Sequence, residues 1–385
     1  MIKNEAYDVC VLKADKYDIE LIENKLREAF SALGIDISTF KGKKVVIKPN
    51  LVMKKSPEHA ATTHPIFLSA LLSLLFKAGI SPTIAESPGG VYSAARLLSI
   101  YRGCGIEDEA KKYDCTLNFD VYSRRCGYDE GITSKSFDII TPIADADVII
   151  DLAKLKSHSL TKMSGAVKNM FGTVPGIVKF EMHSAYPDIN DFSSVICDIC
   201  AMHMKNKSFI SITDGIVGME GDGPTGGDAR QIGVILVSRD PFLSDAVAAR
   251  IIGFDHNDVP ILSEGVRRGY IPQSIDDIRL CGDDVNSLIL NDFKLPNSQR
   301  LAELRFFSHG IMGRFFMPSP SVTKKCRGCG ECAASCPEHT IKISNGRAHI
   351  DASKCIRCYC CQELCPFTAI TIKRNIFINI INNFK

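Results

Sequence analysis

The sequence has no tryptophan, almost no net charge and no apolar run long enough to cross a membrane. The missing tryptophan excludes no class of protein. The 385 residues include 46 lysines and arginines and 44 acidic residues, so the chain lacks the large positive charge typical of a nucleic-acid-binding protein. The longest apolar run, Ile66–Phe76, contains two serines and is far shorter than the ~20 residues of a spanning helix. We therefore expect no nucleic-acid partner and no membrane span.

The N-terminal residues also lack the basic-then-apolar order of a secretory signal peptide, so we expect a cytoplasmic protein. Thiols stay reduced in that compartment, where disulfides are rare, so the sixteen cysteines call for another explanation. Metal binding or catalysis is the expected use instead. Seven cysteines are spread over the first 325 residues, whereas nine lie between Cys326 and Cys365. The chain therefore has two unlike parts.

The first part alternates strand-like and helix-like segments. Apolar stretches predict strands at Val45–Ile47, Ser81–Ala85, Val148–Leu152, Phe209–Ile212, Ile232–Val237 and Ile278–Cys281. Apolar residues three and four apart predict helices at Lys16–Leu33, Ile66–Ala78, Ser93–Tyr101, Ile189–Lys205, Pro241–Ile252 and Pro260–Arg268. This order is typical of an α/β fold, in which we expect a mostly parallel sheet with helices on both faces.

Polar turns follow several of these strands, and they carry the candidate binding residues Lys48, Asn50, Lys154, Lys156, His158, Lys162 and Lys168. Ligands of open parallel sheets bind beyond the carboxyl ends of the strands, so we expect a pocket there. Ammonium groups and backbone N–H donors suit an anionic or phosphorylated ligand. The alternative is a solvated lysine face, in which at least one of Lys154 and Lys156 points to water.

Two other features have a structural and a functional interpretation. The glycine-rich stretch with Gly221, Gly223 and Gly226 predicts a loop that closes over the substrate, but an irregular connection before the next strand explains it equally well. His64 precedes Pro65 at the expected start of a helix, where it acts either as a capping residue or in function.

The second part contains the most specific pattern in the chain. Cys326, Cys329, Cys332 and Cys336 before Pro337 form C-x2-C-x2-C-x3-C-P, and Cys355, Cys358, Cys361 and Cys365 before Pro366 repeat it. Three thiolates on one tight loop can bind three irons of a cubane, while the fourth cysteine ligates the other cluster. Two zinc sites would also use eight thiolates, but zinc motifs usually come as separated C-x2-C pairs.

This segment, Lys324 to Arg374, resembles the bacterial two-cluster ferredoxins. The resemblance implies two short hairpins, two helical turns and two [4Fe–4S] clusters. One cluster takes Cys326, Cys329, Cys332 and Cys365, the other takes Cys355, Cys358, Cys361 and Cys336, and Cys360 remains as a spare thiol. The segment has nine basic and four acidic residues, whereas ferredoxins of this type tend to be acidic. A module that serves its own chain needs no acidic docking face.

The predicted organisation is an α/β domain over residues 1–290, a connector over 291–323, a ferredoxin-like domain over 324–374 and a tail over 375–385. The connector combines three prolines with a middle rich in Phe and Met, and we expect it to pack on the α/β domain.

The α/β part resembles the DUF362 family of iron–sulfur proteins, on motifs that include residues 48–50, 62–65, 151–158, 165–176, 214–215 and 221–227. The family label implies an architecture, often with a C-terminal ferredoxin module, but no chemistry. A more remote similarity connects His158, Lys168 and His183 with the nickel-pincer lactate racemases. That similarity implies an anchoring lysine, an acid/base histidine and a nickel-ligating histidine.

A third cysteine motif, Cys197, Cys200 and His203, has the spacing of one helix face next to an apolar stripe. We interpret it as ordinary helix packing, because small apolar cysteines are commonly buried.

Three functions follow as hypotheses. The first is a reductase in which the clusters deliver low-potential electrons to an anionic substrate held by Lys48, Asn50, Lys154 and the glycine loop. In it His158 is the proton donor, Lys168 is the second catalytic residue, and a redox protein or a small molecule is the electron donor. The second is a non-catalytic electron-transfer or metal-cofactor assembly protein that docks a partner. The third is a nickel-pincer-like isomerase.

Overall fold

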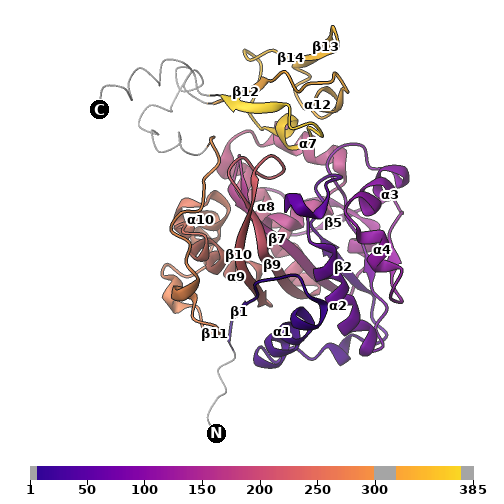
Figure 1. The fold of residues 1–385 in the computed structure, drawn as a ribbon, viewed down its shortest axis with the longest axis vertical. Coiled ribbons are helices and arrows are strands. Elements are labelled where there is room, and N and C mark those ends of the chain that lie inside the picture. Colours follow the sequence, from indigo (N-terminus) through magenta and orange to yellow (C-terminus); the bar gives the residue numbers. More distant parts are fainter. Residues whose placement is uncertain (1–6, 299–317, 374–385) are drawn as a thin grey trace.

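The computed structural model describes residues 7–298 and 318–373. A large α/β part carries a small C-terminal part at one end of its sheet (Figure 1). Among the described helices, none has the length and apolar character needed to span a membrane.

One nine-stranded sheet forms the centre of the α/β part. Its strands are β1 (Val9–Lys13), β2 (Val45–Pro49), β3 (Thr83–Ile84), β4 (Thr116–Leu117), β7 (Val148–His158), β8 (Lys162–Ser164), β9 (Ser208–Glu220), β10 (Asp228–Ser238) and β11 (Leu280–Gly282). Their order is β11-β1-β10-β9-β7-β2-β3-β4, with β8 beside β7. The pairs β1–β11, β2–β3, β2–β7, β3–β4 and β7–β9 are parallel, whereas β1–β10, β9–β10 and β7–β8 are antiparallel. The mostly parallel sheet is thus confirmed.

Helices cover both faces of this sheet, as predicted. They are α1 (Ile19–Ala32), α2 (Pro65–Lys77), α3 (Ala94–Gly103), α4 (Ile106–Ala110), α5 (Thr141–Ala144), α6 (Ala166–Asn169), α7 (Gly176–Ala185), α8 (Ile189–Asn206), α9 (Pro241–Ile251) and α10 (Pro260–Arg267). Alternate residues of a strand point to opposite faces, so Val45 and Ile47 pack with α1 and α2 while Val46 packs with α8 and α9. Two separate cores result, one on each face.

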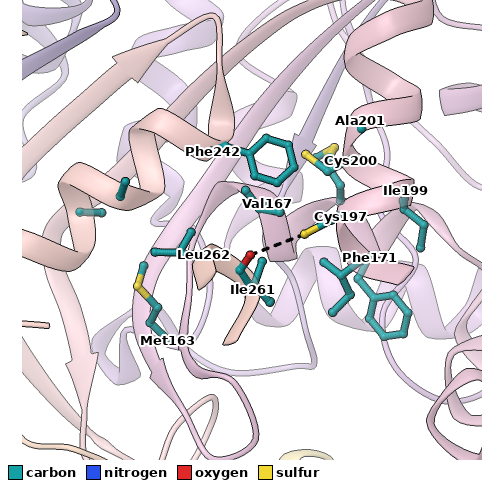
Figure 2. Close-up of a cluster of buried hydrophobic side chains, with 14 of the residues drawn as sticks. Met163, Val167, Phe171, Cys197, Ile199, Cys200, Ala201, Phe242, Ile261 and Leu262 are labelled. Carbon is teal, nitrogen blue, oxygen red and sulfur yellow. Dashed lines mark hydrogen bonds between the residues drawn. The ribbon is translucent and has the colours of Figure 1, made fainter. Parts of the chain in front are cut away.

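The core beneath α8 contains the two cysteines of the C-x2-C-x2-H motif (Figure 2). Cys197 and Cys200 are fully buried, and the Cys197 Sγ lies 3.5 Å from the Ile261 carbonyl oxygen. His203 Nε2 lies 2.9 Å from Thr173 Oγ1. The interpretation as helix packing is confirmed for these three side chains.

Sequence patterns missed the shorter strands and the polar ends of the longer ones. The strands β1, β4 and β8 were not predicted, nor was the outlying pair β5 (Ser123–Gly127) and β6 (Ser136–Ile140). Strand β7 continues to His158, six residues beyond the predicted end, because its lysines lie in the protein interior rather than in a solvated turn. Polar residues in a buried strand break the apolar pattern on which the prediction relies.

The C-terminal part has the two helical turns that the ferredoxin resemblance implies, and two small sheets of which one is a hairpin and the other joins its first and last strands. Its helices are α12 (Glu331–Ala334) and α13 (Cys360–Glu363), and its strands are β12 (Ser319–Val322), β13 (Ile341–Ser344), β14 (Arg347–Ile350) and β15 (Ile370–Lys373). Strand β12 pairs with β15, so the end of the predicted connector joins the ferredoxin-like sheet. The start of the connector packs on the α/β part, where Lys294 O accepts from Gly221 N at 2.8 Å. The middle of the connector and the tail lie outside the described residues.

Candidate functional site

A cavity of about 70 Å³ lies between the carboxyl ends of the central strands and helix α13 of the C-terminal part. That volume holds several water molecules or one small ligand. Its polar lining includes Lys48 and Asn50 from the end of β2, Glu86 after β3, Lys156 and His158 from β7, Lys168 and Asn169 from α6, Lys179 and His183 from α7, and Cys360 and Glu363 from α13. Five of the seven polar residues predicted at the strand ends therefore meet in one place.

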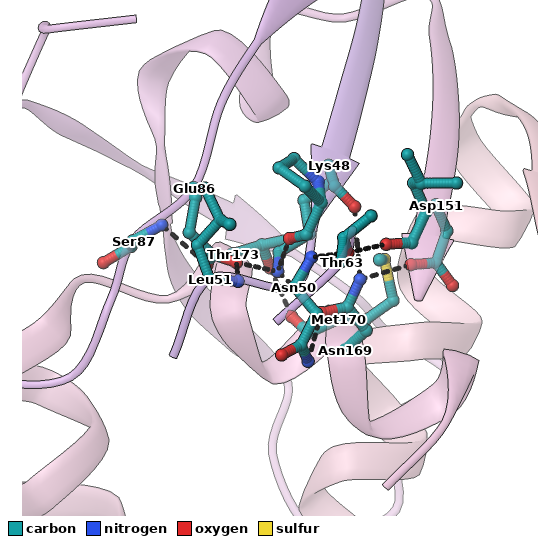
Figure 3. Close-up of polar contacts among 12 residues, drawn as sticks. Lys48, Asn50, Leu51, Thr63, Glu86, Ser87, Asp151, Asn169, Met170 and Thr173 are labelled. Carbon is teal, nitrogen blue, oxygen red and sulfur yellow. Dashed lines mark hydrogen bonds and ion pairs between the residues drawn. The ribbon is translucent and has the colours of Figure 1, made fainter. Parts of the chain in front are cut away.

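Lys48 and Asn50 belong to a closed hydrogen-bond network (Figure 3). Lys48 Nζ donates to Glu86 Oε2 at 2.6 Å and to Asn169 Oδ1 at 2.9 Å. Asn50 Nδ2 donates to the same Asn169 oxygen at 3.0 Å. Glu86 also accepts from the backbone N–H groups of Leu51 and Ser87. The Lys48 charge is thus already neutralised, and its role is to hold three loops together.

Three other lysines give the cavity its positive character. Burial lowers the pKa of Lys156 to about 7 and that of Lys179 to about 7, and it also lowers the pKa of Lys168. Lys156 Nζ donates to Asn50 Oδ1 and Ala61 O, and Lys179 Nζ donates to Ser87 O. The Lys168 ammonium has no hydrogen-bond or ion-pair partner among the described residues and lies 6.0 Å from the centre of the Phe171 ring.

His158 presents one nitrogen to the cavity. Its Nδ1 accepts from the backbone N–H groups of Leu160 and Thr161, at 3.1 and 3.4 Å, so the proton of the neutral ring is on Nε2. Nε2 is buried without a hydrogen-bond partner among the described atoms, and the nearest carboxylate, Glu363, is 3.7 Å away. Burial and the neighbouring Lys168 and Lys156 hold the pKa of His158 well below its usual value. The ring is therefore a neutral N–H donor pointing into the cavity.

His183 lines the same cavity and is stacked on Phe192, with ring centres 4.3 Å apart. Burial lowers its pKa to about 3, so it is also neutral. The residues of the nickel-pincer similarity, His158, Lys168 and His183, thus lie around one cavity.

Lys154 and Lys162 do not line the cavity. Lys154 Nζ lies 2.8 Å from Asp214 Oδ2 and 2.8 Å from the Tyr17 hydroxyl, in the interior. The β7–β9 register shifts between Lys154 and Lys156, and such an irregularity re-aims side chains. Neither Lys154 nor Lys156 points to water, contrary to the solvated-face alternative, since each is only 1% exposed.

His64 caps a helix. Its Nδ1 accepts from the Ile66 N–H at 3.2 Å at the start of α2, and its ring is stacked on Tyr17. The structure thus favours the structural interpretation of this histidine.

The glycine-rich loop is the connection between β9 and β10, and it binds the C-terminal part rather than enclosing the cavity. Thr225 Oγ1 donates to Glu363 O at 2.8 Å, and Gln362 Nε2 donates to Asp222 O at 3.3 Å. Gly221, Gly223 and Gly226 are outside the cavity lining, to which the loop contributes Pro224. A side chain at Gly223 would collide with Ser157 O, so this glycine permits close packing on β7.

Several lining residues were not predicted from the sequence. Asn169 was within the quoted motifs and Glu86 was not, and nothing local shows that they meet Lys48, which is 121 and 38 positions away. Lys179 lies in the unpredicted helix α7, and Glu363 belongs to the other part of the chain. Only Cys360 carried a signal, as the cysteine left over from the ferredoxin pattern.

The eight patterned cysteines form two cages. Cys326, Cys329, Cys332 and Cys365 line one small cavity, and Cys336, Cys355, Cys358 and Cys361 line another, which Cys360 also borders. Backbone N–H groups donate to the thiols of Cys326, Cys336, Cys355 and Cys365, as is usual around iron–sulfur clusters. Within residues 7–298 and 318–373, no three metal-binding side chains are grouped around a single-ion site. The cages therefore fit [4Fe–4S] clusters better than zinc ions.

Comparisons with known proteins agree with this division. Residues 45–250 match the DUF362 family, described as a domain of unknown function, and residues 325–369 match a 4Fe-4S dicluster domain. Over 293 residues the chain is 30% identical to the thylakoid-associated protein sll1697 of Synechocystis sp., covering 75% of this chain and 87% of that protein. Over 58 residues it is 31% identical to ferredoxin YfhL of Escherichia coli, covering 14% of this chain and 67% of that protein.

Among solved structures, the lactate racemase apoprotein from Thermoanaerobacterium thermosaccharolyticum matches with a TM-score of 0.36 and 12% identity, covering 63% of this chain and 56% of that chain. The family match spans more than half of the chain, and the first relative is matched over most of its length. The chain is a member of the DUF362 family with a C-terminal 4Fe-4S dicluster domain of the ferredoxin type.

Proposed function

We propose that this protein is a reductase in which the cavity between its two parts binds a small anionic substrate. When bound, the two [4Fe–4S] clusters supply single electrons at low potential. The observation that carries the proposal is the composition of the cavity, which joins the buried lysines Lys156, Lys168 and Lys179 of the α/β part to helix α13 of the cluster-binding part. We place this activity in the reducing cytoplasm that the sequence predicts.

The charges around the cavity support an anionic ligand. Four lysines and two carboxylates line it, and Glu86 is already paired with Lys48. Lys168 and Lys179 are then the groups that would hold the anion. A bound anion would offset the free-energy cost of removing hydration water from these two buried ammonium groups.

His158 would donate a hydrogen bond from Nε2 to the negative charge that develops on the substrate, because a neutral imidazole is too weak an acid to release that proton. A two-electron reduction also consumes two protons, and Lys156 and Lys179, with pKa values of about 7, are the neighbouring groups able to release them near neutral pH. Removal of the His158 ring should therefore slow the reaction by roughly 100-fold or more, the usual contribution of one such hydrogen-bond donor.

The test uses anaerobic protein reduced photochemically and mixed with nitrite, sulfite, pyruvate or fumarate while cluster absorbance is followed. We expect at least one anion to reoxidise the protein, and His158→Ala to slow this reaction at unchanged iron content. His59→Ala is the matched control, because His59 is exposed and lies outside the cavity. The proposal is wrong if no anion reoxidises the protein, or if the two variants react equally fast.

The cofactor-dependent isomerase is a second candidate because His158, Lys168 and His183 line one cavity. It requires nickel or another group at Lys168. Metal analysis distinguishes the two functions, since the reductase needs iron and no nickel.

A further inference from the structure

Three of the four acidic residues in the C-terminal part contact the α/β part. Glu331 pairs with Arg96 at 3.2 Å, Glu338 accepts from Ser184, and Glu363 lies 3.7 Å from His158. Glu338 and Asp351 are exposed. Seven basic side chains are exposed as well, namely Lys324, Lys325, Arg327, Lys342, Arg347, Lys354 and Lys373. None of the seven forms an ion pair with another described residue.

The first cysteine cage is lined by both Arg327 and Glu331 and has an exposed edge. Cys329 is the exposed member of the cage, while the other cluster cysteines are buried or half-buried. Ile343 and Phe367 line the same cage and remain 38% and 44% exposed. The hairpin of β13 and β14, which carries Ile343 and Arg347, projects away from the α/β part (Figure 1).

Four of the basic residues adjoin this exposed edge. Arg327 lines the cage, Lys324 and Lys325 directly precede Cys326, and Arg347 reaches the Val322 carbonyl oxygen at 3.0 Å. Together with Cys329, Ile343 and Phe367 they form what we call the outer face. An apolar centre with a charged rim is the usual anatomy of a transient protein interface.

We propose that the outer face docks an acidic protein that delivers electrons one at a time to the first cage. The docked protein would be the electron donor of the proposed reductase. This proposal rests on the proposed function only because both require that the clusters carry electrons. In each encounter the donor is oxidised by one electron and the cluster is reduced by one electron, and no bond is made or broken.

The charge of the clusters nearly cancels the net charge of the C-terminal part. Residues 318–373 have eight basic and four acidic side chains, and two oxidised clusters with their thiolates carry about −4 together. The attraction for an acidic partner therefore rests on the four basic residues at the rim of the outer face rather than on net charge. The ferredoxin-like part thus has a basic face where free ferredoxins usually have an acidic one. A basic face is expected on a protein that accepts electrons from an acidic donor.

Nucleic acid is another polyanion that could bind basic side chains. The outer face favours a protein, because its centre is an exposed cluster ligand flanked by aliphatic and aromatic side chains. Binding of a single-stranded oligonucleotide is therefore measured in the same experiment.

The experiment follows cluster reduction in the full-length holoprotein by stopped-flow absorbance, with a reduced acidic plant-type [2Fe–2S] ferredoxin as the donor. The second-order rate constant should fall by about tenfold or more between low and high salt, since opposite charges steer the encounter. Lys324→Glu combined with Lys325→Glu should slow the reaction about tenfold at low salt and have little effect at high salt. The readout is reduction of the clusters rather than turnover, so this proposal and the reductase can fail separately.

The control variant combines Lys41→Glu with Lys43→Glu, two exposed lysines just before the amino end of β2, whereas the cavity lies at the carboxyl ends of the strands. It should react like the wild type. Reduced methyl viologen, a small cation, should reduce every variant fully and show that the clusters are intact. The proposal is overturned if the rate is independent of salt, if both double variants react alike, or if the Lys324/Lys325 variant loses oligonucleotide binding while it accepts electrons at the normal rate.

Discussion

At the scale of single residues, the site depends on lysines whose partners are remote in the sequence. The residues Lys48, Asn50, Lys156, His158 and Lys168, which the sequence pattern places in turns after strands, line one cavity. The pattern could not predict what each one does, because the Lys48 charge is neutralised by a glutamate on another loop. Local sequence indicates which groups gather at a sheet edge, whereas the tertiary partners decide which charges remain available.

The lowered pKa values of Lys156 and Lys179 predict how binding changes with pH. Both are about 7, and an anion binds the protonated form. Affinity for formate should therefore be constant below about pH 6 and fall as the pH rises through 7, by up to tenfold per unit for one titrating lysine. Calorimetric titration of the wild type and of Lys179→Met measures this. An affinity that rises with pH would contradict the account.

Cys360 lines the cavity and borders the second cage, but the ferredoxin pattern gives it no iron. Cys360→Ser should keep about eight irons and eight sulfides per chain, while Cys332→Ser should lose iron. Chemical iron and sulfide determination on anaerobic protein tests this. Equal loss in both variants would make Cys360 a ligand and would undermine the proposed cluster assignment.

At the scale of elements, the longer helices were predicted well and the short helices at the site were not. Helix α6 has four residues, too few for any periodic pattern, and it is fixed from outside by α9. Asp245 on α9 accepts from the backbone N–H groups of Ala166 and Val167, at 2.7 and 2.9 Å. This pair of hydrogen bonds sets the position of Lys168.

Asp245→Ala should therefore leave two buried N–H groups without an acceptor. We expect the free energy of unfolding to fall by about 2–4 kcal/mol, and formate to bind more weakly as Lys168 moves. Asp255→Ala is the control, because Asp255 accepts from Asn257 N on the surface, where water can replace it. Anaerobic urea unfolding followed by circular dichroism compares the two. Equal losses would show that the α6 contact is unimportant.

At the scale of the whole molecule, the α/β part contains both of its cores within itself. The contact with the C-terminal part adds a small apolar cluster of Phe180, Cys360 and Leu364. A chain ending before Val322 should therefore remain folded, with a cooperative thermal transition, but bind formate more weakly because Glu363 and Cys360 no longer close the cavity. An insoluble or molten fragment would show that the two parts fold as one.

The central claim is that a small anion binds between the two parts, close to the clusters. It is tested most directly by the relaxation of [13C]formate in the presence of the reduced, paramagnetic holoprotein. We predict faster 13C relaxation on reduction of the wild type, and loss of that enhancement in the Lys168→Met, Lys179→Met double variant at unchanged iron content. No enhancement in the wild type, or the same enhancement in the variant, would contradict the account.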